Sequence, residues 1–363
     1  MPRIAVYAIA LDEAPFAQRF FDGAKEADMV VVADTGSTDD TVARLRAAGA
    51  IVHQISISPW RFDDARNAAL ALVPADIDIC VSLDLDEVAA PGWRAALERA
   101  WAPGTTSAFF RFHWSHDANG APLVSEYAKK VHARRGFRWR YPCHEGLYPD
   151  RIRDVSVVIE DMVVDHWQDT AKSRAQYPDL LRLAVAENPH DRRCAFLLGR
   201  DLMMAEDWDR AIPELRRYLT LDGPLFVEER CNVQRFLSRC EAGRGGMDEA
   251  LSWARRAADG APHLREPWVD LAFLLYERGD WPACYDAARR ALDMDPASVP
   301  QRMEASAWGP LPHDLASIAA WNLGLTAEAL RHAREAHLLA PEDARLAGNV
   351  TLIEARMAPK TKG

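Results

Sequence analysis

The sequence has no long hydrophobic run, few cysteines and no cysteines in metal-binding spacing, and each absence excludes a class of protein. No stretch approaches the roughly 20 consecutive apolar residues that a membrane-crossing helix needs. The six cysteines form no C-x-x-C pair, so we predict buried free thiols in a reducing compartment. The apolar N-terminus is too short and too weakly flanked for a secretory signal and predicts a β-strand instead. We therefore expect a cytoplasmic protein with no membrane span.

Basic residues are too few to form a general nucleic-acid surface. Lys and Arg number 44 against 54 Asp and Glu, which gives a net charge of −10. Binding to phosphate backbones depends on positive charge, so this balance weighs against nucleic acid as a partner without excluding it. A basic cluster in residues 129–140 is compatible with a phosphate site or with a solvated loop. The length of 363 residues and an ordinary globular composition predict two domains.

The first half of the chain alternates short apolar strands with helices. The pattern predicts strands at 3–10, 29–33, 51–57 and 78–83, and helices at 13–27, 38–48 and 62–72. Such alternation is typical of a parallel sheet with helices on both faces. Ligands of these sheets bind beyond the carboxyl ends of the strands. Asp34, after the second strand, and Asp84, after the fourth, are therefore expected to face one crevice.

Strand patterns stop near residue 191, and helix pairs recur from there. Small residues occupy equivalent places after a turn at positions 211, 250, 284 and 329. Their separations scatter around the roughly 34-residue period of tetratricopeptide repeats, whose units bury apolar surface only by stacking. We predict an α-solenoid, with an irregular helical bundle as the alternative. The predicted organisation is an α/β domain at 1–170, a helical domain at 171–357 and a flexible tail at 358–363.

Two carboxylates follow the apolar strand pattern of residues 78–83. In an extended segment, residues i and i+2 point the same way, so Asp84 and Asp86 are predicted to converge on one cation. Hard divalent ions such as Mg²⁺ and Mn²⁺ prefer such oxygen ligands. The alternative is a solvated turn after a strand.

Further motifs lie at the ends of the predicted strands and at a helix start, in the order Asp12-Glu13, Asp34-Thr-Gly-Ser-Thr-Asp39, Arg66-Asn67 and Asp84-Leu-Asp86. In this order they resemble the family 2 glycosyltransferases of GT-A fold, over about residues 3–170. Together with His144-Glu145, a later His166 and the helical repeats, they also resemble a bacterial branch of that family found in surface-polysaccharide and peptide glycosylation. One departure is Asp12, which stands where the family usually has Asn.

The resemblance implies an inverting, metal-dependent transfer of a hexose-type sugar from a nucleoside-diphosphate sugar, such as a UDP-sugar, to a hydroxyl acceptor. It implies a Rossmann-like GT-A domain in which the donor is bound by Asp12, Asp34, Arg66, Asn67 and Asp84. The implied Mn²⁺ or Mg²⁺ ion would be held by Asp84, Asp86 and His166. Glu145 is the first candidate for the general base, and Asp117 is the second.

The acceptor and the activity itself are left open by the sequence. A saccharide, a peptide or protein side chain held by the helical repeats, and a hydroxymethylated DNA base are the acceptor classes, and the acidic balance weighs against the last. The alternative function is a non-catalytic tetratricopeptide scaffold that binds peptides beside a degenerate transferase domain. A nucleotidyltransferase would usually carry a glycine-rich basic loop after the first strand, where this chain has Ala10-Leu-Asp-Glu-Ala-Pro15.

Overall fold

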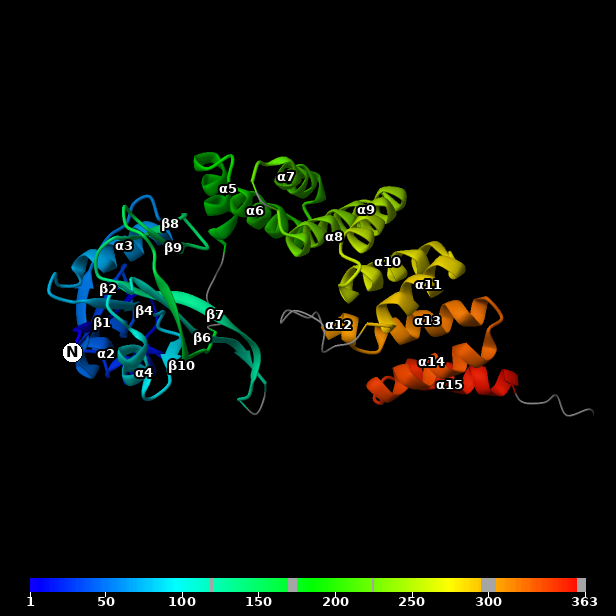
Figure 1. Ribbon diagram of the computed structural model, residues 1–363, viewed down its shortest axis with the longest axis horizontal. Helices are drawn as coiled ribbons and strands as arrows, with labels where there is room; N and C mark the ends of the chain where they lie inside the picture. Colours follow the sequence, from blue (N-terminus) through cyan, green and yellow to red (C-terminus); the bar gives the residue numbers. More distant parts are fainter. Residues whose placement is uncertain (118–119, 169–174, 224, 295–304, 358–363) are drawn as a thin grey trace, which may run out of the picture. The chain divides into compact units, whose positions relative to one another are not determined.

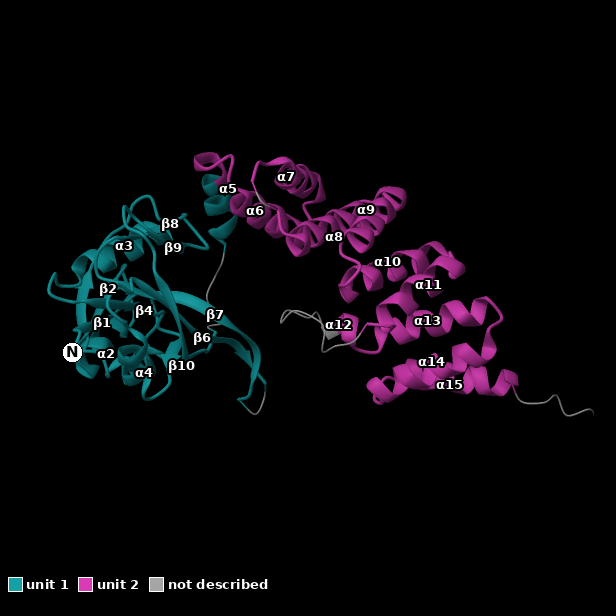
Figure 2. Cartoon of the chain, viewed as in Figure 1, with its two compact units in different colours: residues 1–184 teal, residues 185–363 magenta. Residues whose placement is uncertain are grey.

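The computed structural model describes residues 1–117, 120–168, 175–223, 225–294 and 305–357. The chain divides into two compact units, residues 1–184 and 185–363 (Figure 2). The boundary predicted after residue 170 and the predicted tail at 358–363 both lie outside the described residues.

The first unit is built on an eight-stranded sheet with the order β3-β2-β1-β4-β7-β6-β10-β5, and on a separate β8-β9 ribbon (Figure 1). The strands are β1 (Ile4–Ala10), β2 (Met29–Asp34), β3 (Ile51–Gln54), β4 (Ile79–Ser82), β5 (Glu87–Ala89), β6 (Ser107–His116), β7 (Pro122–Ala133), β8 (Phe137–Arg140), β9 (Gly146–Pro149) and β10 (Ser156–His166). β1 to β4 are parallel, as predicted, but β7 runs antiparallel to both of its neighbours. The prediction of a wholly parallel sheet is therefore wrong for the second half of the unit, where the sheet is mixed.

Helices cover both faces of this sheet because side chains of a strand alternate between its two faces. The helices of the unit are α1 (Ala17–Ala24), α2 (Thr41–Ala48), α3 (Phe62–Leu72) and α4 (Trp93–Ala100). Ile4 and Val6 of β1 pack in a core with α1, α2 and α4. Ala5 and Tyr7, on the opposite face, pack in a second core with α3 and β8. The predicted helix layers on both faces are confirmed.

The second unit consists of helices that pack on their neighbours in chain order (Figure 1). α5 (Tyr177–Glu187) crosses the division between the units, and the following helices are α6 (Arg192–Met204), α7 (Trp208–Thr220), α8 (Val227–Gly243), α9 (Met247–Gly260), α10 (Arg265–Arg278), α11 (Trp281–Leu292), α12 (Ala305–Trp308), α13 (Leu311–Asn322), α14 (Thr326–Leu339) and α15 (Ala344–Met357). The pairs are α6/α7, α8/α9, α10/α11 and α13/α14, and the first helix of each pair also contacts the first helix of the next. Stacked pairs of this kind form a solenoid, as predicted.

The four small positions predicted from the sequence are structurally equivalent. Each is the fourth residue of the second helix of its pair and is fully buried: Ala211, Ala250, Cys284 and Ala329. Ser238 Oγ, twelve residues before Ala250, donates a hydrogen bond of 2.8 Å to its carbonyl, and Ser317 Oγ donates one of 2.9 Å to the carbonyl of Ala329. Small residues at both positions let the helices of a pair approach closely, so the repeat interpretation is confirmed.

All six cysteines lie within the described residues, are buried and form no disulfide, as predicted. Among the described helices, none combines the length and the apolar composition that crossing a bilayer demands.

Candidate functional site

The predicted acidic residues gather at the carboxyl edge of the parallel strands. β2, β1 and β4 are neighbours in the sheet and run in the same direction. Asp34 is the last residue of β2, Asp12 follows β1, and Asp84 follows β4. Because parallel neighbours end at the same edge, the three carboxylates belong to one end of the sheet, as expected from the sequence.

Asp34 and Asp12 shape the loop between β2 and α2. Asp34 is fully buried and accepts hydrogen bonds from the backbone N–H groups of Gly36 and Ser37, at 3.2 to 3.3 Å. Asp12 Oδ1 accepts one of 2.6 Å from Thr38 N–H. These bonds hold residues 35–40 outside the helix, which begins at Thr41 and not at residue 38 as predicted. The roles of Asp12 and Asp34 in donor binding stay predictions.

A buried arginine joins two of the predicted site residues. The Arg66 side chain is only 7% exposed, and its Nη1 lies 2.7 Å from Asp84 Oδ1 while its Nε lies 2.5 Å from Glu145 Oε1. The guanidinium lies over the ring of Trp139, 5.0 Å from its centroid. Arg66 therefore brings together a carboxylate after β4 and a carboxylate just before β9, although the two are distant in sequence.

Asn67 fixes the element that carries this arginine. Its side-chain amide donates to the Trp139 carbonyl at 2.9 Å and accepts from the Trp139 N–H at 3.0 Å. Both backbone groups of a β8 residue are thus tied to α3. Asn67 acts here as a clamp between two elements, and its predicted contact with a donor is not tested.

Lys130 and Glu87 complete the charged network, and the sequence did not assign either of them to the site. Lys130 Nζ of β7 lies 3.4 Å from Asp84 Oδ2 and also forms a close ion pair with Glu87. Glu87 Oε2 in turn accepts a 3.0 Å hydrogen bond from Asp84 N–H. Glu87 directly follows the acidic motif, and Lys130 belongs to the basic cluster at 129–140, so both signals were present in the sequence.

The network sets the charge of its carboxylates. Burial raises the pKa of Glu87 to about 7, against the opposing charge of Lys130. Burial alone would also raise the pKa of Asp84, but Arg66 and Lys130 hold it well below its usual range. The network therefore favours the charged form of Asp84 and disfavours that of Glu87.

Asp86 and His166 form a second pair of interacting side chains, beside the Arg66 network. His166 Nε2 lies 3.3 Å from Asp86 Oδ2, and His166 Nδ1 lies 3.2 Å from the Trp114 carbonyl, which accepts its hydrogen bond. Although burial alone would lower the pKa of His166, the hydrogen bond and charge of Asp86 raise it. The His166 ring also stacks on Phe112. The expected pairing of a late histidine with the acidic motif is thus present in the geometry.

Asp84 and Asp86 have different partners because the chain turns between them. β4 ends at Ser82, residues 85–86 form a turn, and Glu87 N–H donates to the Asp84 carbonyl at 2.9 Å. The extended segment assumed from the sequence is therefore wrong. A carboxylate oxygen and an imidazole nitrogen, from Asp86 and His166, suit Mn²⁺, whereas Asp84 already faces two cations. The metal roles of all three residues stay predictions.

Asp117, the second candidate for general base, lies in the turn between β6 and β7. Its Oδ1 accepts a 2.9 Å hydrogen bond from Ala121 N–H, and its own N–H donates to the Ala121 carbonyl at 2.8 Å. This carboxylate helps to close the hairpin, whereas Glu145 is part of the Arg66 network. The geometry therefore favours Glu145 of the two.

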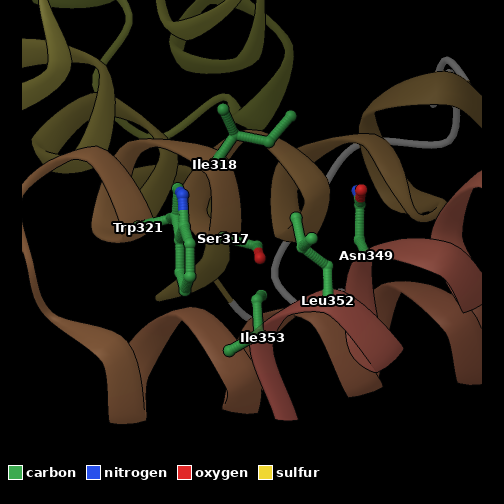
Figure 3. Close-up of a pocket in the computed structure, with 6 residues that line it drawn as sticks. All are labelled: Ser317, Ile318, Trp321, Asn349, Leu352 and Ile353. Carbon is green, nitrogen blue, oxygen red and sulfur yellow. The ribbon is translucent and has the colours of Figure 1, made fainter. Parts of the chain in front are cut away.

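The helical unit has a small pocket between α13 and α15 (Figure 3). It is lined by Ser317, Ile318, Trp321, Asn349, Leu352 and Ile353. Its volume of about 190 Å³ lies below the roughly 300–1,000 Å³ of typical small-molecule pockets. The lining of the pocket is mostly apolar.

Comparison with known proteins supports the interpretation of the second unit as helical repeats. No protein-family model matches the chain. The TPR repeat-containing protein Synpcc7942_0270 of Synechococcus elongatus is 26% identical over 317 residues, which cover 82% of this chain and 76% of that protein. This share is more than residues 185–363 can supply, so the similarity extends into the first unit.

Two solved structures of TPR proteins each match about half of this chain. YrrB, a TPR protein with an unusual peptide-binding site, is 14% identical with a TM-score of 0.41 and covers 50% of this chain and 85% of its own. MamA is also 14% identical, with a TM-score of 0.39, and covers 49% of this chain and 99% of its own. The stacked helix pairs form an α-solenoid, and the name of this relative of 26% identity is in agreement with that architecture.

Proposed function

We propose that the first unit transfers a sugar from a nucleoside-diphosphate sugar to a hydroxyl acceptor, with inversion and with the help of a divalent metal ion. One observation carries this proposal: at the carboxyl edge of the parallel strands, Arg66 is bound to both Asp84 and Glu145. An ordered set of buried charges at this edge is what a binding site for a charged nucleotide requires. The order of motifs that resembles family 2 glycosyltransferases supports the same activity.

The chain supplies groups for each part of the reaction. A divalent ion bound near Asp86 and His166 would supply positive charge for the leaving diphosphate. Arg66 and Lys130 are cations of the protein that share the carboxylate of Asp84, and Arg66 would turn from Glu145 to a donor phosphate. Glu145 would then take the proton of the acceptor hydroxyl. At the same time the hydroxyl oxygen would form a bond to the sugar carbon, and the bond from that carbon to the nucleoside diphosphate would break.

A thermal-shift series with UDP, UDP-sugars and other nucleoside-diphosphate sugars, each with and without Mn²⁺, tests donor binding. A ligand at about 100 times its Kd stabilises the folded protein by roughly 2.7 kcal/mol, which is readily measured. We expect Mn²⁺-dependent stabilisation by one donor class and its loss in Asp86→Asn. Asp161→Asn is the matched control, because Asp161 is an exposed β10 residue paired with Arg99. No stabilisation by any nucleotide would contradict the proposal.

Glu145→Gln tests the base separately from binding. We expect transfer to the acceptor to slow by at least a hundredfold, while the stabilisation by the donor changes little. An equal loss of donor binding and of turnover would show that Glu145 positions Arg66 and does not take the proton.

A peptide-binding scaffold is the second candidate function. It is favoured by the curated relative, whose name refers to the repeats alone, and by the apolar pocket of α13 and α15 (Figure 3). A scaffold would bind peptides without any nucleotide effect. Leu352→Asp, which places a charge in the pocket, should then weaken peptide binding measured by fluorescence anisotropy. If the protein is a transferase with no peptide partner, neither the wild type nor this variant should bind peptides.

A further inference from the structure

Two histidines of β6 converge on one carboxylate of β10. His113 Nδ1 lies 2.8 Å and His116 Nε2 lies 2.9 Å from the same oxygen, Asp165 Oδ1. His113 and Asp165 are direct partners in the parallel pairing of the two strands. The His116 side chain is 5% exposed, and that of Asp165 is 31% exposed, so the cluster is mostly enclosed and open to solvent at the carboxylate.

The shape of β6 is what brings the second histidine to this cluster. In a regular strand, residues three apart point to opposite faces. The pairing of β6 with β7 shifts register between His113 and Ser115 and again between Ser115 and His116. Such irregularities re-aim side chains and are common beside functional sites. Here they place His116 on the same side as His113.

We propose that His113, His116 and Asp165 form a binding site for a transition-metal ion such as Zn²⁺. Their ligand atoms lie within 4.8 Å of one another. Two imidazole nitrogens and one carboxylate oxygen are a ligand set of Zn²⁺, which binds them at about 2.0–2.2 Å and leaves a fourth position for water or substrate. Modest side-chain movement brings three atoms so placed around one ion.

This site is distinct from the contact between Asp86 and His166. Asp165 and His166 are successive residues of β10, and successive strand residues point to opposite faces. The His166 ring packs on Phe112, whereas Asp165 is bound to the two histidines. The two sites therefore can be tested independently, and this inference does not depend on the proposed transferase activity.

A tryptophan provides an optical signal for the site. The ring of Trp167 stacks on that of His116, with centroids 4.3 Å apart and planes 9° from parallel. A bound Cu²⁺ or Co²⁺ ion would lie close enough to quench the fluorescence of this tryptophan. The quenching should be weaker in Trp167→Phe, while the uptake of metal remains.

The test is Zn²⁺ binding to the full chain, freed of metal by a chelator, measured by calorimetry at neutral pH. We expect His113→Gln/His116→Gln to lose one bound Zn²⁺ or at least tenfold in affinity. The control His53→Gln changes an exposed histidine of β3 and should leave binding unchanged. The Asp86→Asn variant should also retain this Zn²⁺, which separates the site from the proposed catalytic metal.

Two results would overturn the proposal: no Zn²⁺ uptake by the wild-type protein, or equal uptake by the wild type and the double variant. If circular dichroism shows that the double variant is unfolded, Asp165→Asn serves instead. It keeps an oxygen that accepts both histidine hydrogen bonds but removes the charged ligand, so undiminished Zn²⁺ binding in that folded variant would equally contradict the site.

Discussion

The two units of the chain differ in how far apart in the sequence their buried partners lie. In the first, charged side chains that are far apart in sequence meet in the interior: Arg66 and Glu145 are 79 residues apart, and Asp86 and His166 are 80 apart. In the second, contacts join helices that are close in the chain: Ser238 and Ala250 are 12 residues apart, and the buried Arg235 and its partner Asp270 are 35 apart. Partners far apart in the sequence meet only once the whole sheet has formed, whereas the helical unit is built from contacts between neighbouring helix pairs.

The largest effect is expected when the arginine of the charged network is removed. Arg66→Met takes away the cation beside Glu145 and leaves Asp84 with Lys130 alone, and breaking a buried ion pair costs about 3–5 kcal/mol. Urea denaturation should show this loss. Arg99→Met is the matched control, since Arg99 and Asp161 are 64% and 78% exposed, and it should cause no measurable change. Equal effects of the two substitutions would mean that the network contributes no more than a surface pair.

A second, pH-dependent effect is expected from the hydrogen-bond chain beneath the network. Trp139 Nε1–H donates to Tyr7 Oη at 2.7 Å, Tyr7 lies 2.9 Å from His132 Nε2, and His132 Nδ1–H donates to the Ala133 carbonyl at 2.8 Å. The His132 ring therefore accepts at Nε2 and is neutral. Burial lowers its pKa to about 4.

The direction in which pH changes the stability follows from proton uptake. Between pH 6.5 and about 4 the unfolded chain protonates this histidine and the folded chain does not, so His132 makes stability fall as the pH is lowered through this window. The expected loss is about 3 kcal/mol. His132→Gln should remove that part of the pH dependence in urea denaturation, and His53→Gln, on the surface, should keep it. An unchanged pH profile in His132→Gln would contradict the neutral, buried state.

In the helical unit, a smaller loss is expected from one added methyl group. A Cβ at Gly199 of α6 would lie 2.7 Å from the Leu215 side chain of α7. Gly199→Ala must therefore move α7 or its leucine, at a cost of about 1–2 kcal/mol that exceeds the gain in helix propensity. Thermal unfolding should show a lower midpoint. A higher midpoint would mean that the pair packs more loosely than its distances indicate.

The smallest effect, of opposite sign, is expected at Gly348 of α15. A Cβ there meets nothing within 4 Å. Gly348→Ala should then stabilise the helix by up to about 1 kcal/mol, because only the helix propensity changes. The two glycine substitutions together separate the effect of packing between helices from that of the helix backbone. A loss of stability at Gly348 would show that α15 needs this glycine for a contact.

Local patterns in the sequence predicted much of this architecture. α3 has the predicted bounds. The small residues of the repeats recur because each helix pair packs against its neighbour in the same way. The candidate residues Arg66, Glu145 and His166 were also found in the sequence. Their motifs did not reveal Lys130 as a partner of Asp84, since nothing local links a β7 lysine to the end of β4.

The sequence by itself determined the two-part organisation, the helix pairs and the residue types of the candidate site, because periodicity and motif spacing act over a few residues. Only the tertiary structure decided which charges meet. The turn after Asp84 separates it from Asp86, the order of strands brings Lys130 to it, and irregular pairing of β6 gathers His116 beside Asp165. The physical reason is that a carboxylate buried away from water needs a charged or hydrogen-bonding partner within a few ångströms. The packing of the strands determines which side chains lie that close, and their separation in the sequence does not.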